Sequence, residues 1–231
     1  MYRVLLVEDD PVIAKIVQYY LSDGGDYQVS WAKDAGEALY LARKTFDVIL
    51  LDIMLPDVDG LELCAKFRER MYCPIIFISC IDDEDTIVQA LQMGGDDYLT
   101  KPFNCKVLRA KIEANLRRAQ FAREHNSATR LDYPDFIIDV DGHAIVRGKK
   151  RVVLSPMEFR VLMYFAERPG KVVTLDELYA DVWEKDSFGD VRTVIVHVYN
   201  LRKKMENELG ARRCIKNLRG EGYFFDPDVE K

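Results

Sequence analysis

The sequence contains no stretch of eighteen consecutive apolar residues, and its amino terminus has no basic segment followed by an apolar one. A membrane-spanning helix needs about 20 apolar residues in a row, and a secretory signal needs both of those missing segments. Met1 is instead followed directly by Tyr2-Arg3-Val4-Leu5-Leu6-Val7, which has the composition of a β-strand. We therefore expect a cytoplasmic protein without membrane association.

Cysteine is scarce and irregularly placed. The chain has an odd number of cysteines, five, and no two of them form a C-x-x-C pair. They lie within or beside apolar runs, at Cys64, Cys73, Cys80, Cys105 and Cys214. Disulfide frameworks use even numbers of cysteines, and zinc sites use closely spaced pairs. The pattern favours small buried side chains in a reducing compartment.

Charge is divided unevenly along a chain that is long enough for two domains. The 231 residues are 48% hydrophobic, which is sufficient for two ordinary cores. Residues 1–120 hold 14 basic and 20 acidic residues, whereas residues 121–231 hold 19 of each. Within the second half, residues 192–219 hold eight basic and two acidic residues. Because phosphate attraction acts within a Debye length of roughly 8 Å, this segment can bind nucleic acid despite the negative total charge.

The first half alternates short apolar, β-branched runs with helical stretches. The runs cover residues 3–7, 27–31, 48–51, 75–78 and 98–99. This alternation predicts a doubly wound α/β domain, in which helices cover both faces of a five-stranded parallel sheet.

Polar residues follow four of these runs. They are Glu8-Asp9-Asp10, Asp52, Ser79 and Lys101-Pro102. Because the carboxyl ends of parallel strands line one crevice, we expect these side chains to converge. Several ionised carboxylates in one pocket require a cation, and Asp9 and Asp52, assisted by Glu8, offer the oxygen ligands that Mg²⁺ prefers.

A lysine opposite such a cluster suits phosphoryl transfer. Lys101 can neutralise one phosphoryl oxygen while Mg²⁺ holds another, which leaves the Asp52 carboxylate to attack phosphorus, and Ser79 would add a third contact. An acidic pair or a Lys-Pro pair alone is usually a solvated loop or a turn, so only the combination is informative. The other acids of this half, Asp10, Asp57 and residues 82–85, are interpreted as solvent-facing or helix-capping.

These motifs resemble the receiver (CheY-like) family over residues 2–118. The resemblance rests on Val7-Glu8-Asp9-Asp10, Leu50-Leu51-Asp52-Ile53-Met54-Leu55-Pro56, Asp59-Gly60, Phe77-Ile78-Ser79 and Gly94-Gly95-Asp96-Asp97-Tyr98-Leu99-Thr100-Lys101-Pro102-Phe103. It implies the strand order 2-1-3-4-5 and makes Asp52 the acceptor of a phosphoryl group from a sensor histidine kinase. It also implies that Asp9 and Asp52 bind Mg²⁺ together with the Met54 carbonyl.

The same resemblance implies further roles around the acceptor. Lys101 pairs with the phosphoryl group, and the Lys101-Pro102 bond is cis. Ser79 and Tyr98 occupy the switch positions, where a hydroxyl approaches the phosphoryl oxygen and an aromatic ring turns inward. Tyr98 could alternatively serve packing alone.

The second half of the sequence has a different pattern of apolar and polar residues from the first. Residues 119–130 are polar and mixed in charge, like a linker or a frayed helix end, which divides the chain into domains at 1–118 and 131–231. Strand-like runs at 136–140, 143–146 and 151–154 are joined by Asp141-Gly142 and Gly148-Lys149-Lys150. Such turns predict an antiparallel sheet.

Helices and a hairpin follow this sheet. Helix starts are indicated by Ser155-Pro156-Met157-Glu158 and by the capping box Thr174-Leu175-Asp176-Glu177. A third helix is expected at about 190–208, and residues 213–218 and 223–225 flank Arg219-Gly220-Glu221-Gly222 as a hairpin. The prediction is a smaller α+β domain with three helices and a wing.

The third helix has two different faces. Its core stripe is Val194, Val198, Leu201 and Met205. The opposite face carries Arg192, Val196, Tyr199 and Lys203, flanked by Asn200 and Arg202. Such a face can contact phosphates and base edges of double-stranded DNA. A basic helix end alone could be merely solvated, and the wing is what favours DNA.

This half resembles the OmpR/PhoB family of winged helix-turn-helix regulators over residues 131–226. The resemblance rests on Leu154-Ser155-Pro156-Met157-Glu158-Phe159, Val182-Trp183, residues 192–198, Leu201-Arg202-Lys203-Lys204 and Leu218-Arg219-Gly220-Glu221-Gly222-Tyr223. The implied phosphate or base contacts are Arg192, Thr193, His197, Arg202 and Lys203, with Arg219 in the minor groove. Residues 184–190 would meet RNA polymerase.

Two positions of the third helix depart from the family. Asn200 stands where some relatives have arginine, which suggests an adenine contact in place of guanine. Ile195 stands where aspartate is common, and its role is left open.

Relatives form homodimers through the fourth helix, fifth strand and fifth helix of the receiver. Candidate ion pairs here join Asp96 and Asp97 with Lys111 and Arg118, and a third pair is replaced by Ile87 and Val107. Because an exposed ion pair contributes only about 0–1 kcal/mol, we expect an apolar contact there and salt-tolerant association.

Two other functions have to be set against this one. An enzymatic second half would need a nucleophile or metal cluster, but only His125, His143 and His197 are scattered there, so we expect no enzyme activity. A DNA-binding regulator whose receiver dimerises independently of phosphorylation remains an alternative.

Overall fold

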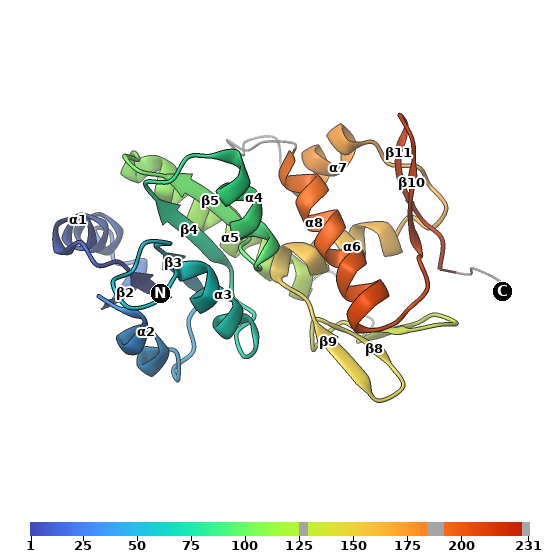
Figure 1. Ribbon diagram of the computed structural model, residues 1–231, viewed down its shortest axis with the longest axis horizontal. Coiled ribbons are helices and arrows are strands. Elements are labelled where there is room, and N and C mark those ends of the chain that lie inside the picture. The colour runs from blue at the N-terminus through green and yellow to red at the C-terminus, as the bar shows by residue number, and fades with distance from the viewer. Residues whose placement is uncertain (125–128, 184–191, 228–231) are drawn as a thin grey trace. The chain divides into compact units, whose positions relative to one another are not determined.

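The computed structural model describes residues 1–124, 129–183 and 192–227 of the chain. These residues form two compact units, Met1–Ala119 and Gln120–Lys231 (Figure 1). The last helix of the first unit, α5 (Cys105–Glu124), runs into the segment predicted as a linker. In the described parts of the chain, no helix combines the length and the apolar character that crossing a membrane requires.

The first unit is built on a five-stranded parallel sheet in the order β2-β1-β3-β4-β5, which confirms the predicted order. The strands are β1 (Tyr2–Val7), β2 (Tyr27–Ala32), β3 (Val48–Leu51), β4 (Ile75–Ser79) and β5 (Asp97–Thr100). The central strands β3 and β4 are buried along their whole length. This explains why they read as continuous apolar runs and not as alternating ones.

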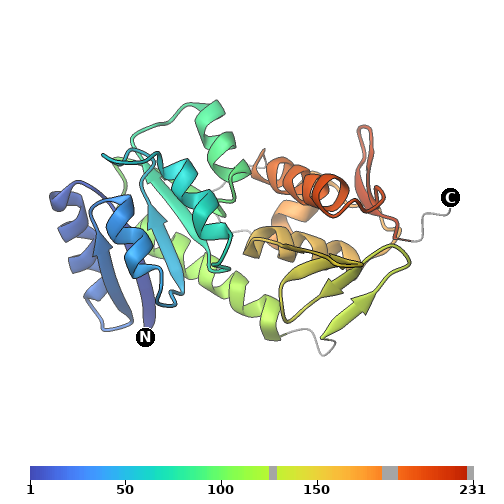
Figure 2. The same ribbon diagram turned by 60° about the horizontal axis from the view of Figure 1, so that its bottom comes forward.

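Helices cover both faces of this sheet (Figures 1 and 2). Besides α5 they are α1 (Pro11–Ser22), α2 (Ala35–Leu41), α3 (Gly60–Arg68) and α4 (Glu84–Gln92). Side chains of β1 alternate between two cores: Val4 and Leu6 pack with α1 and α5, whereas Leu5 and Val7 pack with α2, α3 and α4. Full burial of one such side chain contributes about 1.5–3 kcal/mol, so the two cores hold the strand ends in place.

Aspartates begin the first four helices. Asp10, Asp34, Asp59 and Asp83 are the N-caps of α1 to α4, and each accepts a hydrogen bond from a backbone N–H of the first turn. The carboxylate of Asp57 also caps the start of α2, because it accepts hydrogen bonds from the N–H groups of Ala35 and Gly36. The capping interpretation is therefore confirmed for Asp10, Asp57 and Asp83. Each cap contributes about 1 kcal/mol.

The second unit begins with an antiparallel sheet of four strands. They are β6 (Arg130–Asp132), β7 (Ile137–Asp139), β8 (Ala144–Arg147) and β9 (Lys150–Val153). The sequence predicted only the last three. It missed β6 because three residues with polar ends, Arg-Leu-Asp, show no period, and their pairing with β7 is what makes them a strand.

Three helices and a hairpin complete this unit. The helices are α6 (Pro156–Ala166), α7 (Leu175–Val182) and α8 (Arg192–Lys203), with α8 continued by a π-helical turn η1 (Lys204–Glu208). The hairpin is β10 (Ile215–Leu218) and β11 (Gly222–Phe225). Both predicted capping boxes are present, Ser155 with Glu158 and Thr174 with Glu177. The three helices and the wing are thus confirmed.

The wing is attached to the start of α7. Val173 and Tyr223 exchange two backbone hydrogen bonds of 2.7 and 2.9 Å, and Thr174, the next residue, caps α7. Gly222 beside Tyr223 has φ +141°, and a Cβ there would lie 2.1 Å from the Val173 carbonyl oxygen. A glycine is therefore required where the wing meets the helix-turn-helix.

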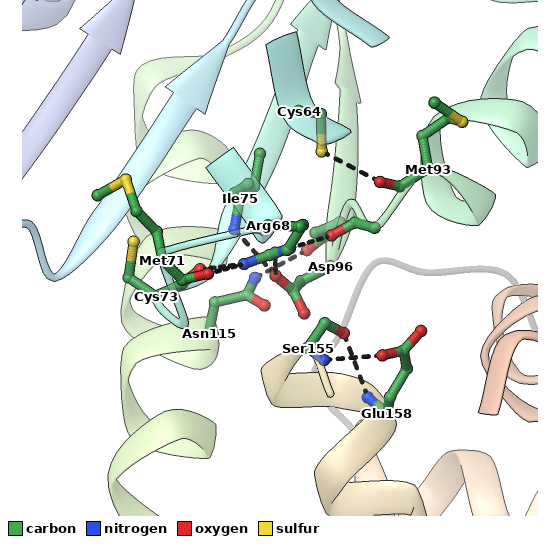
Figure 3. Close-up of polar contacts among 12 residues, drawn as sticks. Cys64, Arg68, Met71, Cys73, Ile75, Met93, Asp96, Asn115, Ser155 and Glu158 are labelled. Carbon is green, nitrogen blue, oxygen red and sulfur yellow. Dashed lines mark hydrogen bonds and ion pairs between the residues drawn. The ribbon is translucent and has the colours of Figure 1, made fainter. Parts of the chain in front are cut away.

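A half-buried arginine, Arg68, connects the end of α3 to the start of β5 (Figure 3). Arg68 donates to the carbonyl oxygens of Gly94 and Cys73 at 2.7 Å each, and it pairs with the carboxylate of Asp96. That carboxylate is fully buried and also accepts from the N–H of Ile75 at 2.9 Å. Arg68 therefore engages within the receiver the carboxylate that was predicted to form an ion pair across a dimer interface.

We expect Arg68→Ala to lower the free energy of unfolding by about 3–5 kcal/mol, because it removes the guanidinium that pairs with the buried Asp96 carboxylate. Urea-induced unfolding followed by circular dichroism measures this. Arg68→Ala combined with Asp96→Asn should cost less than the sum of the single changes. Arg70→Ala, at an exposed position nearby, is the control, with an effect within about 0.5 kcal/mol. Additive effects at Arg68 and Asp96 would contradict the coupling.

Candidate functional site

Three carboxylates meet at the carboxyl ends of β1 and β3. One oxygen from each of Glu8, Asp9 and Asp52 lies within 4.8 Å of the others. Val7 pairs with Leu51 in the sheet, so the residues that follow them are neighbours. Glu8 is fully buried and Asp52 is 4% exposed, whereas Asp9 is exposed. The predicted convergence of these three side chains is therefore present, and Asp9 opens the cluster to solvent.

Lys101, which follows β5, bridges two of these carboxylates. Its Nζ lies 2.6 Å from Oδ2 of Asp52 and 2.7 Å from Oε2 of Glu8, and its side chain is 7% exposed. The Lys101-Pro102 peptide bond is cis, as the receiver resemblance implied. Glu8, Asp52 and Lys101 follow β1, β3 and β5, so residues far apart in the sequence meet at one end of the sheet.

The electrostatics of this cluster favour a charged lysine. Burial raises the pKa of Glu8, and the hydrogen bond from Lys101 opposes that effect only in part. Burial by itself lowers the pKa of Lys101, but the hydrogen bonds to Asp52 and Glu8 outweigh it, and the pKa is raised. The cluster holds three carboxyl groups and one ammonium group. An all-oxygen set of carboxyl ligands fits a hard divalent cation.

Ser79 and Tyr98 are joined through the loop after β4. Ser79 is fully buried, and its Oγ accepts from the N–H of Ile81 at 3.4 Å. The Tyr98 hydroxyl donates to the carbonyl oxygen of Ile81 at 2.7 Å. Burial raises the pKa of Tyr98 to about 12, with a hydrogen bond to Ser79 acting in the opposite direction. The phenol is therefore neutral at physiological pH, and both side chains contact one residue.

The loop after Asp52 depends on Gly60. The N–H of Met54 donates to Oδ1 of Asp52 at 3.1 Å, and the N–H of Gly60 donates to the carbonyl oxygen of Ile53 at 2.8 Å. A Cβ on Gly60 would lie 2.1 Å from the carbonyl oxygen of Asp52 and 2.6 Å from Cα of Ile53. Any side chain at residue 60 would therefore displace the backbone of the acceptor.

Sequence reasoning missed one residue of this site. The indole Nε1 of Trp31 donates to the carbonyl oxygen of Glu8 at 2.8 Å and so holds the backbone of the acidic cluster. Trp31 lies in β2, where its sequence position suggests core packing only. Trp31 lies next to Glu8 because β1 pairs with β2 in the sheet.

The predicted DNA-binding residues differ in exposure. Tyr199, Lys203 and Arg219 are exposed, and Thr193 and Arg202 are half-buried. Val196, His197 and Asn200 are buried, with exposed fractions of 7%, 1% and 5%. Arg192 is the first residue of α8. The outward orientation predicted for α8 is thus found at Tyr199 and Lys203 and differs at Val196 and Asn200, because a periodic stripe locates the centre of a buried face but not its width.

His197 packs within the second unit. Its ring centroid lies 5.5 Å from that of Trp183, the residue that ends α7. α8 contacts both α6 and α7, so its covered surface is wider than the single stripe seen in the sequence. The burial of His197 against Trp183 differs from the predicted DNA contact.

Several basic residues of the segment 192–219 are paired inside this unit. Arg213 makes two contacts with the carboxylate of Glu206, at 2.9 and 3.0 Å, and Arg202 lies 3.5 Å from the same carboxylate. Lys204 pairs with Glu158 at 2.6 Å. Lys203 makes no ion pair with any residue that the structure describes, so its charge faces solvent on α8.

The predicted dimer residues are also partly engaged within one chain. Lys111 pairs with Asp97 at 2.7 Å, and Asn115 donates to the same carboxylate at 3.1 Å. Ile87 and Val107 are half-buried, and Arg118 is 3% exposed. A cross-interface pair formed by Asp97 or Lys111 would therefore replace an existing one. The predicted RNA polymerase loop, residues 184–190, lies outside the described residues.

We expect Gly60→Ala to lower the free energy of unfolding by about 1–3 kcal/mol, because its Cβ overlaps the Asp52 backbone. Gly36→Ala is the matched control. Its Cβ would come no closer than 3.4 Å to a flexible side chain, in an exposed part of α2. It should be neutral or stabilise by about 0.5–1 kcal/mol. Equal unfolding midpoints in urea for both variants would disprove the steric argument.

Comparisons with known proteins agree with this geometry. Residues 4–113 match the response regulator receiver domain, and residues 148–225 match the C-terminal domain of transcriptional regulatory proteins. The chain is similar to a solved mutant of RitR at 26% identity and a TM-score of 0.85, covering 98% of this chain and 99% of that one.

Two further solved structures are similar in sequence. The response regulator DrrB of Thermotoga maritima, described as an OmpR/PhoB homolog, is 32% identical over 98% of this chain and 99% of its own, with a TM-score of 0.47. A two-component response regulator from Clostridium difficile is 35% identical over 51% of this chain and 98% of its own, with a TM-score of 0.49. Because residues 4–113 and residues 148–225 match these two family models, the chain belongs to the OmpR/PhoB family of response regulators, in which a receiver domain precedes a winged-helix DNA-binding domain.

Proposed function

We propose that Asp52 of this two-component transcription factor accepts a phosphoryl group from a sensor histidine kinase, and that phosphorylation promotes dimerisation and promoter binding. The observation that carries this proposal is the contact of 2.6 Å between Lys101 and Asp52 inside an acidic cluster. The receiver match over residues 4–113 supports the kinase as partner.

Asp52 is the nucleophile in this proposal. One carboxylate oxygen is held by the N–H of Met54 and the other by Lys101, so the carboxylate is oriented before the donor arrives. An Asp52 oxygen attacks phosphorus, and the histidine nitrogen of the kinase leaves with the electron pair of the broken P–N bond. Lys101 then shifts toward a phosphoryl oxygen, since an ammonium group on a flexible stem can redirect its three donors.

Mg²⁺ is the proposed cofactor. Glu8, Asp9 and Asp52 would hold it, and the carbonyl of Met54 is a further candidate from the family resemblance. When bound, the ion supplies positive charge that stabilises the phosphoryl oxygens during transfer. The fit rests on three carboxylate oxygens that lie within 4.8 Å of one another.

We expect Mg²⁺ to change the fluorescence of Trp31, because its indole is bonded to the backbone of Glu8. A Trp183→Phe background isolates this signal. Asp9→Asn should raise the Mg²⁺ concentration of half-maximal change by about tenfold or more. Asp10→Asn is the control, since Asp10 caps α1 and asparagine caps equally well. A shift of the same size in both variants would count against Asp9 as a ligand.

Ser79 and Tyr98 are the proposed switch. A phosphoryl oxygen would attract the Ser79 hydroxyl away from the N–H of Ile81. Tyr98 would then exchange its bond to the Ile81 carbonyl for an inward position. Ser79 and Tyr98 are both hydrogen-bonded to the backbone of Ile81. A movement of Ile81 in the loop after β4 would therefore change the contacts of both side chains.

Phosphorylation is proposed to act through a receiver dimer that uses Ile87, Asp97, Val107 and Lys111, whereas Asp96 is engaged by Arg68. DNA binding is proposed for Arg192, Thr193, Tyr199, Arg202, Lys203 and Arg219, whereas Val196 and Asn200 are buried. The contact of residues 184–190 with RNA polymerase is a proposal from the family resemblance. An output by DNA binding and not by enzyme activity is supported by the match of residues 148–225.

Beryllofluoride treatment of the full chain should produce a dimer and tighten DNA binding, and Asp52→Asn should abolish both responses. Light scattering after size exclusion and fluorescence anisotropy measure them. Because Ile87 and Val107 would form an apolar contact in the proposed dimer, the dimer should persist from low to high salt. Asp57→Asn, which changes an exposed capping carboxylate, is the matched control and should respond normally. If neither beryllofluoride nor Asp52→Asn changed dimerisation or DNA binding, the phosphate-independent alternative would be favoured.

We expect Lys203→Ala to flatten the salt dependence of DNA binding by about 0.9 in the slope of log K against log salt, the value for one phosphate contact. Arg202→Ala should flatten it less, because Arg202 is already close to Glu206. Lys149→Ala, an exposed change in the turn between β8 and β9, should leave the slope unchanged. An equal effect of Lys149→Ala would show that general charge, and not α8, sets the slope.

A further inference from the structure

The solvent-exposed side of α8 carries apolar side chains among its basic ones. Among the described residues of the second unit, three large apolar side chains are exposed: Val153, Ile195 and Tyr199, at 39%, 43% and 54%. Two of the three lie on α8, one helical turn apart. A single exposed apolar residue is ordinary in a globular protein, but two neighbours on the helix proposed to enter DNA require a reason.

These two side chains belong to a row along the helix. Ile195, Tyr199 and Lys203 are spaced at i, i+4 and i+8, so successive members are surface neighbours about 5–6 Å apart. The core stripe of α8 lies on a different side, because Val194, Val198 and Leu201 are buried. The row therefore presents two apolar groups followed by one cation to solvent.

The chemistry of the row selects a ligand. Ile195 has no polar side-chain atom, so it cannot bind a phosphate or a hydrogen-bonding base edge. The 5-methyl group of thymine is the apolar feature that bases display in the major groove. We propose that Ile195 and Tyr199 read thymine methyl groups in the operator, while Lys203 binds the backbone beside them. This rests on the proposed function, in which α8 enters the major groove.

The spacing sets where these thymines lie. Bases follow one another at about 3.4 Å along a strand. A separation of about 5–6 Å between the two side chains corresponds to thymines one or two steps apart. The operator half-site thus contains such a thymine pair, read by contact with methyl groups and not by hydrogen bonds.

The test removes single methyl groups from the DNA. The full-length, beryllofluoride-treated protein first selects duplexes from a random pool, and each thymine of the selected duplex is then replaced by uracil. Uracil at one or two positions should weaken binding by about fourfold each, the effect of one buried methyl group. Ile195→Ala should bind more weakly and lose this sensitivity at one position, and Tyr199→Ala should lose it at the other.

Two variants serve as controls. Val153→Ala removes an exposed apolar side chain that lies outside α8, and it should keep the full uracil sensitivity. Tyr199→Phe retains the ring without the hydroxyl and should also keep it, which separates methyl contact from hydrogen bonding. Circular dichroism spectra should be unchanged, since Ile195 and Tyr199 are exposed.

The outcomes separate this inference from the proposed function. A protein that enriches no duplex would overturn DNA binding itself. A protein that binds the selected duplex but is indifferent to uracil at every position would overturn thymine reading and leave DNA binding intact. Uracil sensitivity that survives in both Ile195→Ala and Tyr199→Ala would also overturn it, because another residue would then contact the methyl groups.

Discussion

The ion pair of Lys101 with Asp52 and Glu8 is the interaction on which the receiver site depends. Its members lie at the ends of β5, β3 and β1, and Ser79 ends the strand between β3 and β5. Burying these charges is costly unless they are matched closely. The strand order found here brings these charges together, so the acceptor chemistry depends on the sheet topology.

Two buried aspartates of the receiver, Asp96 and Asp52, are paired with different basic residues. Asp96 pairs with Arg68, whose guanidinium also donates to the carbonyl oxygens of Gly94 and Cys73. These hydrogen bonds fix the orientation of the guanidinium and of the Asp96 carboxylate. Asp52 is held by Lys101, whose ammonium is a point charge on a flexible stem. The planar guanidinium of arginine, with its fixed donors, suits a structural ion pair. The ammonium of lysine can move, which suits a partner carboxylate whose oxygen must become free to react. Arginine is thus used for the structural ion pair of the receiver, and lysine for the ion pair at the proposed reaction site.

In the second unit, basic residues are likewise divided between structure and surface. Lys204 joins η1 to Glu158 of α6, and Arg213 pairs with Glu206 of η1, while Lys203 is exposed beside Tyr199. Local charge alone would count all of these residues equally toward DNA attraction. The ion pairs show that part of that charge is already neutralised inside the unit.

Local patterns in the amino-acid sequence were enough to predict both fold classes, the four residues of the acceptor cluster and several of the helix caps, and the family resemblance added the strand order. These features depend on short motifs and on periods of two or 3.6 residues, which act within a few positions of the chain. Packing in three dimensions produced the other features. It engaged Asp96 with Arg68, 28 residues away, joined Trp31 to Glu8, paired β6 with β7, and buried Val196, His197 and Asn200. Contacts between residues distant in sequence depend on how elements pack against one another, and no local pattern contains that information.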